Sequence, residues 1–272
     1  MTYQTFDLSV DQAIATIRLN RPDALNTMIP AFWTEMVEVF QELQDRFDVR
    51  AVVIASSGKH FTAGLDLGVA KDLFGKPGID EGRKREKLHR KILSMQNSFS
   101  AIETCRVPVI SAIQGGCIGG GVDLVTACDM RVGARGCFFT IQEINLGMVA
   151  DVGTLQRLPH LLPQGLVREL AFTGRRFSDE EALAHGFLNR LEESAEAAFD
   201  AAMAMARDIA TKSPLAIAGI KHVLNKGRAQ TVEQGLEYVA AWNAGMILTE
   251  DVQKGAMSIL HKQQAEYDDL IA

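Results

Sequence analysis

The stretch Gly115–Asp129 reads GGCIGGGVDLVTACD, and it comes one residue after the apolar run Val107–Ile113, which is typical of a strand. Its glycines let backbone N–H groups approach a ligand without a Cβ atom in the way. A helix that begins at such a block also points its N-terminal N–H groups and its positive dipole end at that ligand. Taken alone, the block fits a tight strand-to-helix packing turn equally well.

The glycine block departs from the common phosphate-binding patterns. It does not fit G-x-G-x-x-G, and no GK[ST] follows, which argues against dinucleotide and P-loop sites. The chain has no G-x-S-x-G elbow, which argues against a serine hydrolase. A second loop that could supply N–H donors lies upstream, at Phe61–Asp66 (FTAGLD).

Around the glycine block, apolar strand-like runs alternate with helical patterns, which favours an α/β fold. The chain looks entirely helical from about Ser194 onward, and we see no convincing internal repeat. The predicted strands are Ala13–Leu19, Ala51–Ala55, Val107–Ile113, Asp129–Gly133 and Cys137–Thr140, and the predicted helices include Pro30–Gln44, Arg83–Thr104 and Val122–Ala127.

Three acidic residues share this apolar, glycine-rich part of the chain: Asp123, Glu143 and Asp151. A buried carboxylate is unfavourable unless it is paired or neutralised. Three together predict shifted pKa values and proton-transfer chemistry. Each acid also has an ordinary explanation as a helix cap or a surface residue, and Asp123, near a helix start, is the one most open to it.

Composition excludes several classes of protein. The chain has 272 residues, 47% of them hydrophobic and 23% charged, as in a soluble globular protein. Its net charge of −6 argues against nucleic acid as the main partner. No apolar run approaches the ~18–20 residues of a membrane span, and no signal or transit peptide is recognisable, so we expect a cytoplasmic protein without a membrane partner.

Neither the cysteines nor the histidines suggest a metal site. The four cysteines form no CxxC pair and lie in apolar context, so reduced, buried thiols are expected. The six histidines are scattered and form no HExxH motif or His/Cys cluster. We therefore predict no metal site.

Two signatures together identify a family. FTAGLDL, followed some fifty residues later by VISAIQGGCIGGGVDLVTACDMRVG, resembles the crotonase family, also called the enoyl-CoA hydratase/isomerase superfamily. LNRPDALNTM near the N-terminus and GTLQRLP after Asp151 are similar to its other signatures, and the resemblance covers about residues 1–265. It implies a spiral of β-β-α units, with residues 1–200 as the acyl-CoA-binding catalytic core and residues 201–272 as a helical trimerisation region.

The resemblance also implies roles for the two loops. In this family two peptide N–H groups hold the thioester oxygen while an enolate forms, and the matching donors here are Leu65 and Gly120. Coenzyme A would then be part of the substrate, and the partners would be an acyl-CoA thioester and further copies of the chain, as a homotrimer or a dimer of trimers. The residues expected to line the substrate site are Ala63, Gly64, Asp66 and Gly119.

The acids decide which reaction the resemblance favours. Hydratases of the family carry glutamates at the positions of Asp123 and Glu143 and typically glycine at Asp151. The set found here is similar to that of the Δ(3,5)-Δ(2,4)-dienoyl-CoA isomerases. This similarity predicts that Glu143 serves C2 and Asp151 serves C6, with the reverse assignment left open, and that Asp123 orients or polarises the pair. The alternatives are an enoyl-CoA hydratase and a non-catalytic acyl-CoA- or RNA-binding scaffold.

Overall fold

A central sheet organises the protein, as the computed structural model shows for residues 2–70 and 80–271. The described residues form a sheet with strand order β1-β2-β3-β4-β6-β9, in which β1 and β2 are antiparallel and the later neighbours are parallel. Its strands are β1 (Phe6–Asp11), β2 (Ile14–Leu19), β3 (Ala51–Ser56), β4 (Val109–Ile113), β6 (Met130–Ala134) and β9 (Arg190–Glu192). The α/β class predicted from the sequence is confirmed.

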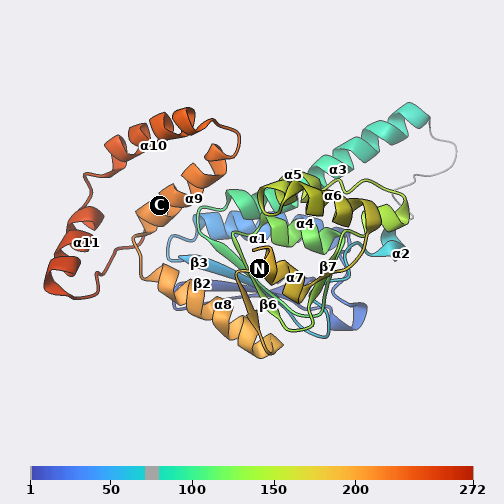
Figure 1. Cartoon of the computed structure of the whole chain (residues 1–272), viewed down its shortest axis with the longest axis horizontal. Coiled ribbons are helices and arrows are strands. Elements are labelled where there is room, and N and C mark those ends of the chain that lie inside the picture. The colour runs from blue at the N-terminus through green and yellow to red at the C-terminus, as the bar shows by residue number, and fades with distance from the viewer. Residues whose placement is uncertain (1, 71–79, 272) are drawn as a thin grey trace.

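One face of this sheet is covered by α8 (Ala195–Ala210), seen below the strands in Figure 1. Ala198, Ala202 and Ala206 recur every four residues, so they lie on one side of the helix, and all three are buried against the sheet. Because β3 and β4 are covered on both faces, every residue in them is buried, which the uninterrupted apolar run Ala51–Ala55 in β3 predicts.

The opposite face packs on helices and on a second, smaller sheet. That sheet has the order β5-β7-β8, with β5 (Gly116–Ile118) parallel to β7 (Phe138–Thr140) and β7 antiparallel to β8 (Phe177–Ser178). The main hydrophobic core lies between these layers. The helices on this side are α1 (Pro30–Asp45), α2 (Leu67–Ala70), α3 (Glu81–Thr104), α4 (Gly120–Ala127), α5 (Thr154–Arg157), α6 (Gln164–Thr173) and α7 (Asp179–Ala184).

The predicted elements agree well with the observed ones. The helix expected over Pro30–Gln44 is α1, the one expected over Arg83–Thr104 is α3, and the one expected over Val122–Ala127 is α4, which begins two residues earlier. The four cysteines are buried and unpaired, as expected. The strand β1 and the short strands β5, β8 and β9 were not predicted, because each has a weak or mixed apolar pattern.

The last part of the described chain, residues 211–271, forms a C-terminal arm that projects away from the core (Figure 1). It contains α9 (Pro214–Gly227), α10 (Val232–Met246) and α11 (Glu250–His261). The boundary predicted at residue 200 falls inside α8, whose buried alanines continue to Ala206. The packing therefore changes after α8, at about residue 211.

One buried lysine connects the arm to the core. Lys221 of α9 is 6% exposed and donates to the carbonyl oxygens of Ile102 and Val107 at 3.3 and 3.0 Å. Its ammonium group also lies 2.7 Å from Oδ2 of Asp129. Burying this charge is tolerable because all its hydrogen-bonding capacity is used.

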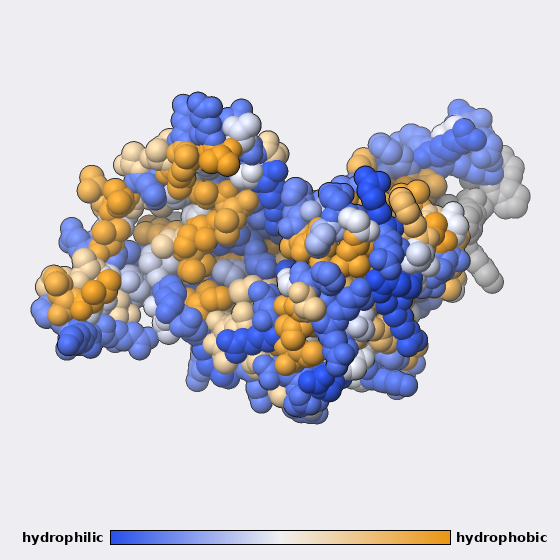
Figure 2. All heavy atoms as spheres, viewed as in Figure 1, coloured by the Kyte–Doolittle hydropathy of each residue, from blue (hydrophilic) through white to orange (hydrophobic). Residues whose placement is uncertain are grey.

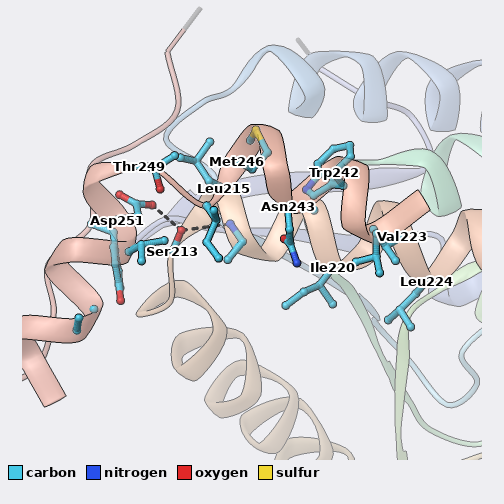
Figure 3. A pocket seen from close by; sticks show the side chains of 18 of the residues that line it. Ser213, Leu215, Ile220, Val223, Leu224, Trp242, Asn243, Met246, Thr249 and Asp251 are labelled. Atoms are coloured by element: carbon cyan, nitrogen blue, oxygen red, sulfur yellow. Dashed lines mark hydrogen bonds between the residues drawn. The ribbon is translucent and has the colours of Figure 1, made fainter. Parts of the chain in front are cut away.

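Apolar side chains are exposed along the C-terminal arm (Figure 2). A cavity of about 740 Å³ lies between α9, α10 and α11, and Figure 3 shows Leu215, Ile220 and Trp242 among its lining residues. The most exposed of the arm's large apolar residues include Leu224, Val232, Leu236, Leu248, Ile259 and Leu260.

Candidate active site

The fold brings the two predicted donor loops side by side. Thr62 and Cys117 form a parallel bridge, in which the Ile118 amide donates to the Thr62 carbonyl at 3.1 Å and the Thr62 amide to the Gly116 carbonyl at 3.2 Å. Residues 61–66 therefore run alongside the glycine block, although some fifty residues separate them in the sequence.

The backbone leaves the amides of Leu65 and Gly120 on neighbouring segments. Leu65 forms a parallel bridge with Met28, in which the Met28 amide donates to the Gly64 carbonyl and the Asp66 amide donates to the Met28 carbonyl. The Leu65 amide takes no part in these bonds and points away from Met28. Gly120 is the first residue of α4, where N–H groups have no partner within the helix. A Cβ atom placed on Gly64 would lie 3.3 Å from the Gly120 nitrogen, which shows how closely the loops approach.

The glycines of the block serve different purposes. A Cβ on Gly120 would point into the core, 2.9 Å from Sδ of Met28, so glycine is needed there to pack α4. Gly119 has φ 53°, and its Cβ would lie 3.4 Å from Oε1 of Glu143. Gly119, rather than Gly120, is thus the glycine whose missing side chain keeps the space beside an acid open.

Asp123 is fully buried in the first turn of α4. Its Oδ1 accepts a hydrogen bond of 2.6 Å from the Thr154 amide, whereas Oδ2 has no partner among the described residues. Burial, together with the nearby charge of Glu143, raises the pKa of Asp123 to about 7. The unpaired Oδ2 agrees with a carboxyl that carries a proton below neutral pH.

Glu143 opens a 3-10 helix, Glu143–Leu146, that follows β7. The Gly119 amide donates to the Thr140 carbonyl at 2.9 Å, which fixes the end of β7 against the glycine block. The helix ends at Gly147, whose φ of 73° reverses the chain and favours glycine. Burial raises the pKa of Glu143, and the charge of Asp151 adds to this.

Asp151 is partly buried on the returning segment, just before α5. Burial raises the pKa of its carboxyl as well. The charges of Glu143 and Asp151 both act on Asp123, so the fold places the three predicted acids close enough to influence each other. The reversal at Gly147 accounts for this proximity, because it returns the chain toward α4.

The four residues expected to line the substrate site have different surroundings. Gly64 and Gly119 adjoin the predicted oxyanion donors, and Ala63 is tied by its amide to the Leu25 carbonyl. The Asp66 carboxylate is already occupied: it accepts from the Thr27 hydroxyl, on the segment before α1, at 2.9 Å and from the Gly68 amide at 2.9 Å. Contact of these residues with a substrate stays a prediction.

The sequence did not single out the polar groups that hold the acids. Thr154 provides the amide that Asp123 accepts, and Gln96 of α3 donates to the Asp151 carbonyl at 2.7 Å. Arg157 lies over Gly153, where a Cβ would come 1.8 Å from the guanidinium. The only sequence signal for these contacts is the helical spacing of Gln96, Ser100 and Glu103 on α3.

The arrangement suits proton transfer next to a carbonyl group. Two neighbouring backbone amides can stabilise an oxygen that becomes negative, and nearby acids with raised pKa values can exchange protons with carbon. Among residues 2–70 and 80–271, no group of three or more His, Cys, Asp or Glu side chains could hold a metal ion. No helix in those same ranges is long and apolar enough to cross a membrane.

Comparison with known proteins identifies the family. The model of the enoyl-CoA hydratase/isomerase family matches residues 9–270, and the chain therefore belongs to this family. It is 43% identical over 260 residues to the mitochondrial Delta(3,5)-Delta(2,4)-dienoyl-CoA isomerase of Mus musculus, covering 95% of this chain and 80% of the mouse protein. The peroxisomal protein of the same name from Arabidopsis thaliana is 40% identical over 271 residues, covering 98% of both chains.

Solved structures show the same fold. A putative enoyl-CoA hydratase from Streptomyces coelicolor A3(2) superimposes with a TM-score of 0.88 and 26% identity, over 98% of this chain and 95% of that one. The predicted crotonase-like fold is thus confirmed. Because the two isomerases above are described as mitochondrial and peroxisomal, they give no support to the cytoplasmic location expected from the sequence, which stays a prediction.

Proposed function

We propose that the protein is a dienoyl-CoA isomerase of fatty-acid β-oxidation, which converts a 3,5-dienoyl-CoA thioester into the conjugated 2,4-dienoyl-CoA. The observation that carries this proposal is the grouping of Asp123, Glu143 and Asp151, each with a raised pKa, beside the amides of Leu65 and Gly120. The two similar proteins named as isomerases of this kind support the same substrate.

The reaction is a balanced internal rearrangement. A proton leaves C2, and its electron pair forms the C2=C3 double bond. The C3=C4 pair moves to C4=C5, and the C5=C6 pair takes a proton at C6. The intermediate is an extended dienolate with negative charge on the thioester oxygen, so a donor at that oxygen and proton carriers at two distant carbons are all required.

Each group has a proposed role. The amides of Leu65 and Gly120 donate to the thioester oxygen, and one such donor typically contributes about 3 kcal/mol to the transition state. Glu143 removes the proton from C2, and Asp151 delivers one to C6. Asp123 orients or polarises this pair. At least one of the three carboxyl groups is protonated at rest, because three crowded carboxylates cannot all ionise at low free-energy cost.

The segment between Glu143 and Asp151 has the apolar character that an acyl-chain substrate would need. Ile144, Leu146, Met148 and Val149 are all exposed, and Val149 is 72% exposed. Clustered exposed apolar residues are typical of a binding surface. A fatty-acyl chain that extends from the thioester would need such a surface near Glu143 and Asp151.

The main alternative is an enoyl-CoA hydratase, which adds water across a 2-enoyl-CoA. The Streptomyces structure supports it at the level of the fold. Asp151 argues against it, because a hydratase needs no acid at a carbon four bonds from C2. A binding scaffold for acyl-CoA or RNA is a further alternative, but it has no need of three acids with raised pKa values, and the net charge of −6 disfavours RNA.

We also propose that the protein assembles as a homotrimer or a dimer of trimers. The C-terminal arm supports this, because its exposed apolar residues resemble a surface that a second copy covers. The acyl-CoA thioester is the only small-molecule partner that the proposal needs, with no cofactor besides the coenzyme A of the substrate.

A spectrophotometric assay tests the proposed activity. Purified protein is offered a 3,5-dienoyl-CoA and a 2-enoyl-CoA in separate reactions, and the rate of forming the 2,4-diene, which is conjugated with the thioester carbonyl, is compared with the rate of hydration. We expect rapid isomerisation and slow hydration. Hydration faster than isomerisation would favour the hydratase, and no turnover of either thioester would favour the scaffold.

A further inference from the structure

A row of polar residues on α3 faces the segment that carries Asp151. Gln96, Ser100 and Glu103 are spaced four and three residues apart, so they lie along one side of the helix. We call them the α3 polar stripe. The neighbouring residues Met95 and Phe99 are buried in the core, which fixes the rotation of the helix and hence the direction of the stripe.

Each member of the stripe contacts either α5 or the segment Asp151–Thr154 that leads into it, which we call the Asp151 turn. Gln96 Nε2 donates to the Asp151 carbonyl at 2.7 Å, and the Ser100 hydroxyl accepts from Arg157 at 3.3 Å. Glu103 accepts from Nε of Arg157 at 3.0 Å, and this arginine also reaches the Val152 carbonyl at 3.4 Å. The stripe thus holds the backbone on the C-terminal side of Asp151.

Asp123 holds the same turn from the other side, through the Thr154 amide. The backbone from Asp151 to Thr154 is therefore fixed by contacts on both of its sides. With its peptide groups fixed in this way, Asp151 has only side-chain rotation left to move its carboxyl. A cavity of about 390 Å³, lined by Gln96, Gln156 and Arg157 among others, lies next to the stripe, so packing alone does not hold the turn there.

We propose that Gln96 is a positioning residue for proton delivery by Asp151. It acts through the Asp151 carbonyl, which it holds so that the carboxyl keeps its place beside Glu143. This inference rests on the proposed isomerase activity, and it assigns Gln96 to the step at C6 rather than the step at C2. A shift of about 1 Å in a reacting group can lower a rate roughly 100-fold, so a single hydrogen bond can matter here.

The test compares two matched variants. Gln96→Met keeps the length of the side chain and removes the amide donor. Gln156→Met makes the same change on an exposed residue that lines the same cavity, with no side-chain hydrogen bond among the described residues. Should Gln96→Met fail to fold, Gln96→Glu serves instead, because a carboxylate of the same size cannot donate to the carbonyl.

Two measurements on a 3,5-dienoyl-CoA in D₂O decide the question. We expect Gln96→Met to lower kcat by roughly 10- to 100-fold with little change in KM, because the variant alters the position of a proton carrier and not a group proposed to bind the substrate. Substrate recovered before full conversion should carry more deuterium at C2 per product formed, because removal at C2 continues while delivery at C6 slows. Gln156→Met should match the wild type in both measurements.

Two results would overturn the inference: equal kcat in the two variants, or a loss in Gln96→Met with an unchanged ratio of C2 exchange to isomerisation. If the wild type itself does not isomerise the thioester, the proposed function fails separately. Amide hydrogen exchange over residues 148–156 then decides the role of Gln96. Exchange should be faster in Gln96→Met than in Gln156→Met, and equal exchange would refute the positioning role.

Discussion

Replacing Asp123 with asparagine should stabilise the folded protein at alkaline pH. The carboxyl is fully buried, its Oδ2 has no partner among the described residues, and its pKa is raised to about 7. Asparagine has the same shape and no charge. Its amide oxygen can still accept from the Thr154 amide, which Oδ1 accepts from in the wild type.

The sign follows from proton binding. The folded protein holds the Asp123 proton more tightly than the unfolded chain, where an aspartate has a pKa of about 3.9. Ionisation therefore penalises the folded state, and this contribution to stability falls as pH rises from about 4 to about 7. A shift of about 3 pKa units corresponds to a penalty of about 4 kcal/mol above neutral pH.

Comparing two pH values isolates the charge. An unpaired NH₂ group in Asp123→Asn costs about 1–3 kcal/mol, but it does so at every pH and cancels in the comparison. The penalty grows by about 1.4 kcal/mol for each pH unit between pH 5 and the pKa of about 7. The stability difference between variant and wild type should therefore be about 3 kcal/mol more favourable to the variant at pH 9 than at pH 5. In thermal melts this corresponds to roughly 6–12 °C.

Urea unfolding and thermal melts at pH 5 and pH 9 test this reasoning. Asp151→Asn is the control, because that carboxyl is only partly buried and its pH effect should be smaller. A variant whose stability relative to wild type is the same at both pH values would refute the argument. It would mean that Asp123 is ionised throughout, with a pKa close to that of an exposed aspartate.

The remaining predictions concern activity and assembly. Glu143→Gln and Asp151→Asn should each lower isomerisation roughly 10²–10⁴-fold with the fold intact, as circular dichroism and kcat will show; near-normal activity of Asp151→Asn would favour the hydratase. Leu65→Ile should be mild, because the N–H remains. Gly120→Val should lower kcat severely, because the valine side chain meets Met28 and displaces the Gly120 amide. An equal kcat for Leu65→Ile and Gly120→Val would contradict the oxyanion assignment. Sedimentation should show a trimer or hexamer, and a stable monomer at micromolar concentration would refute the assembly.

The sequence predicted the parts of the fold that depend on local patterns. The uninterrupted apolar run in β3 and the proline at the start of α1 each identified an element and came close to its limits. The strands β5 and β8 were missed, because strands of two or three residues exist only through their neighbours. The boundary at residue 200 fell inside α8, whose alanines give no strong signal until the sheet that they cover is known.

The candidate site could be predicted only in its chemistry. Apolar surroundings were enough to single out Asp123, Glu143 and Asp151, and the structure raises the pKa of all three. The residues that hold them could not be found in this way. Gln96 acts through a backbone carbonyl that lies 55 positions away in the sequence, and such a contact leaves no mark on local composition.

Lys221 has a consequence for how the chain can be divided. Its ammonium group reaches from α9 into the core, where it satisfies two backbone carbonyls and the Asp129 carboxylate. A chain cut after α8 would remove this donor from the Ile102 and Val107 carbonyls, at the end of α3 and just before β4, while the Asp129 carboxylate would keep the Val109 amide. The C-terminal arm is therefore not an independent domain. Its removal would leave buried polar groups of the core without their partner, so the core and the arm should be expressed and engineered as one unit.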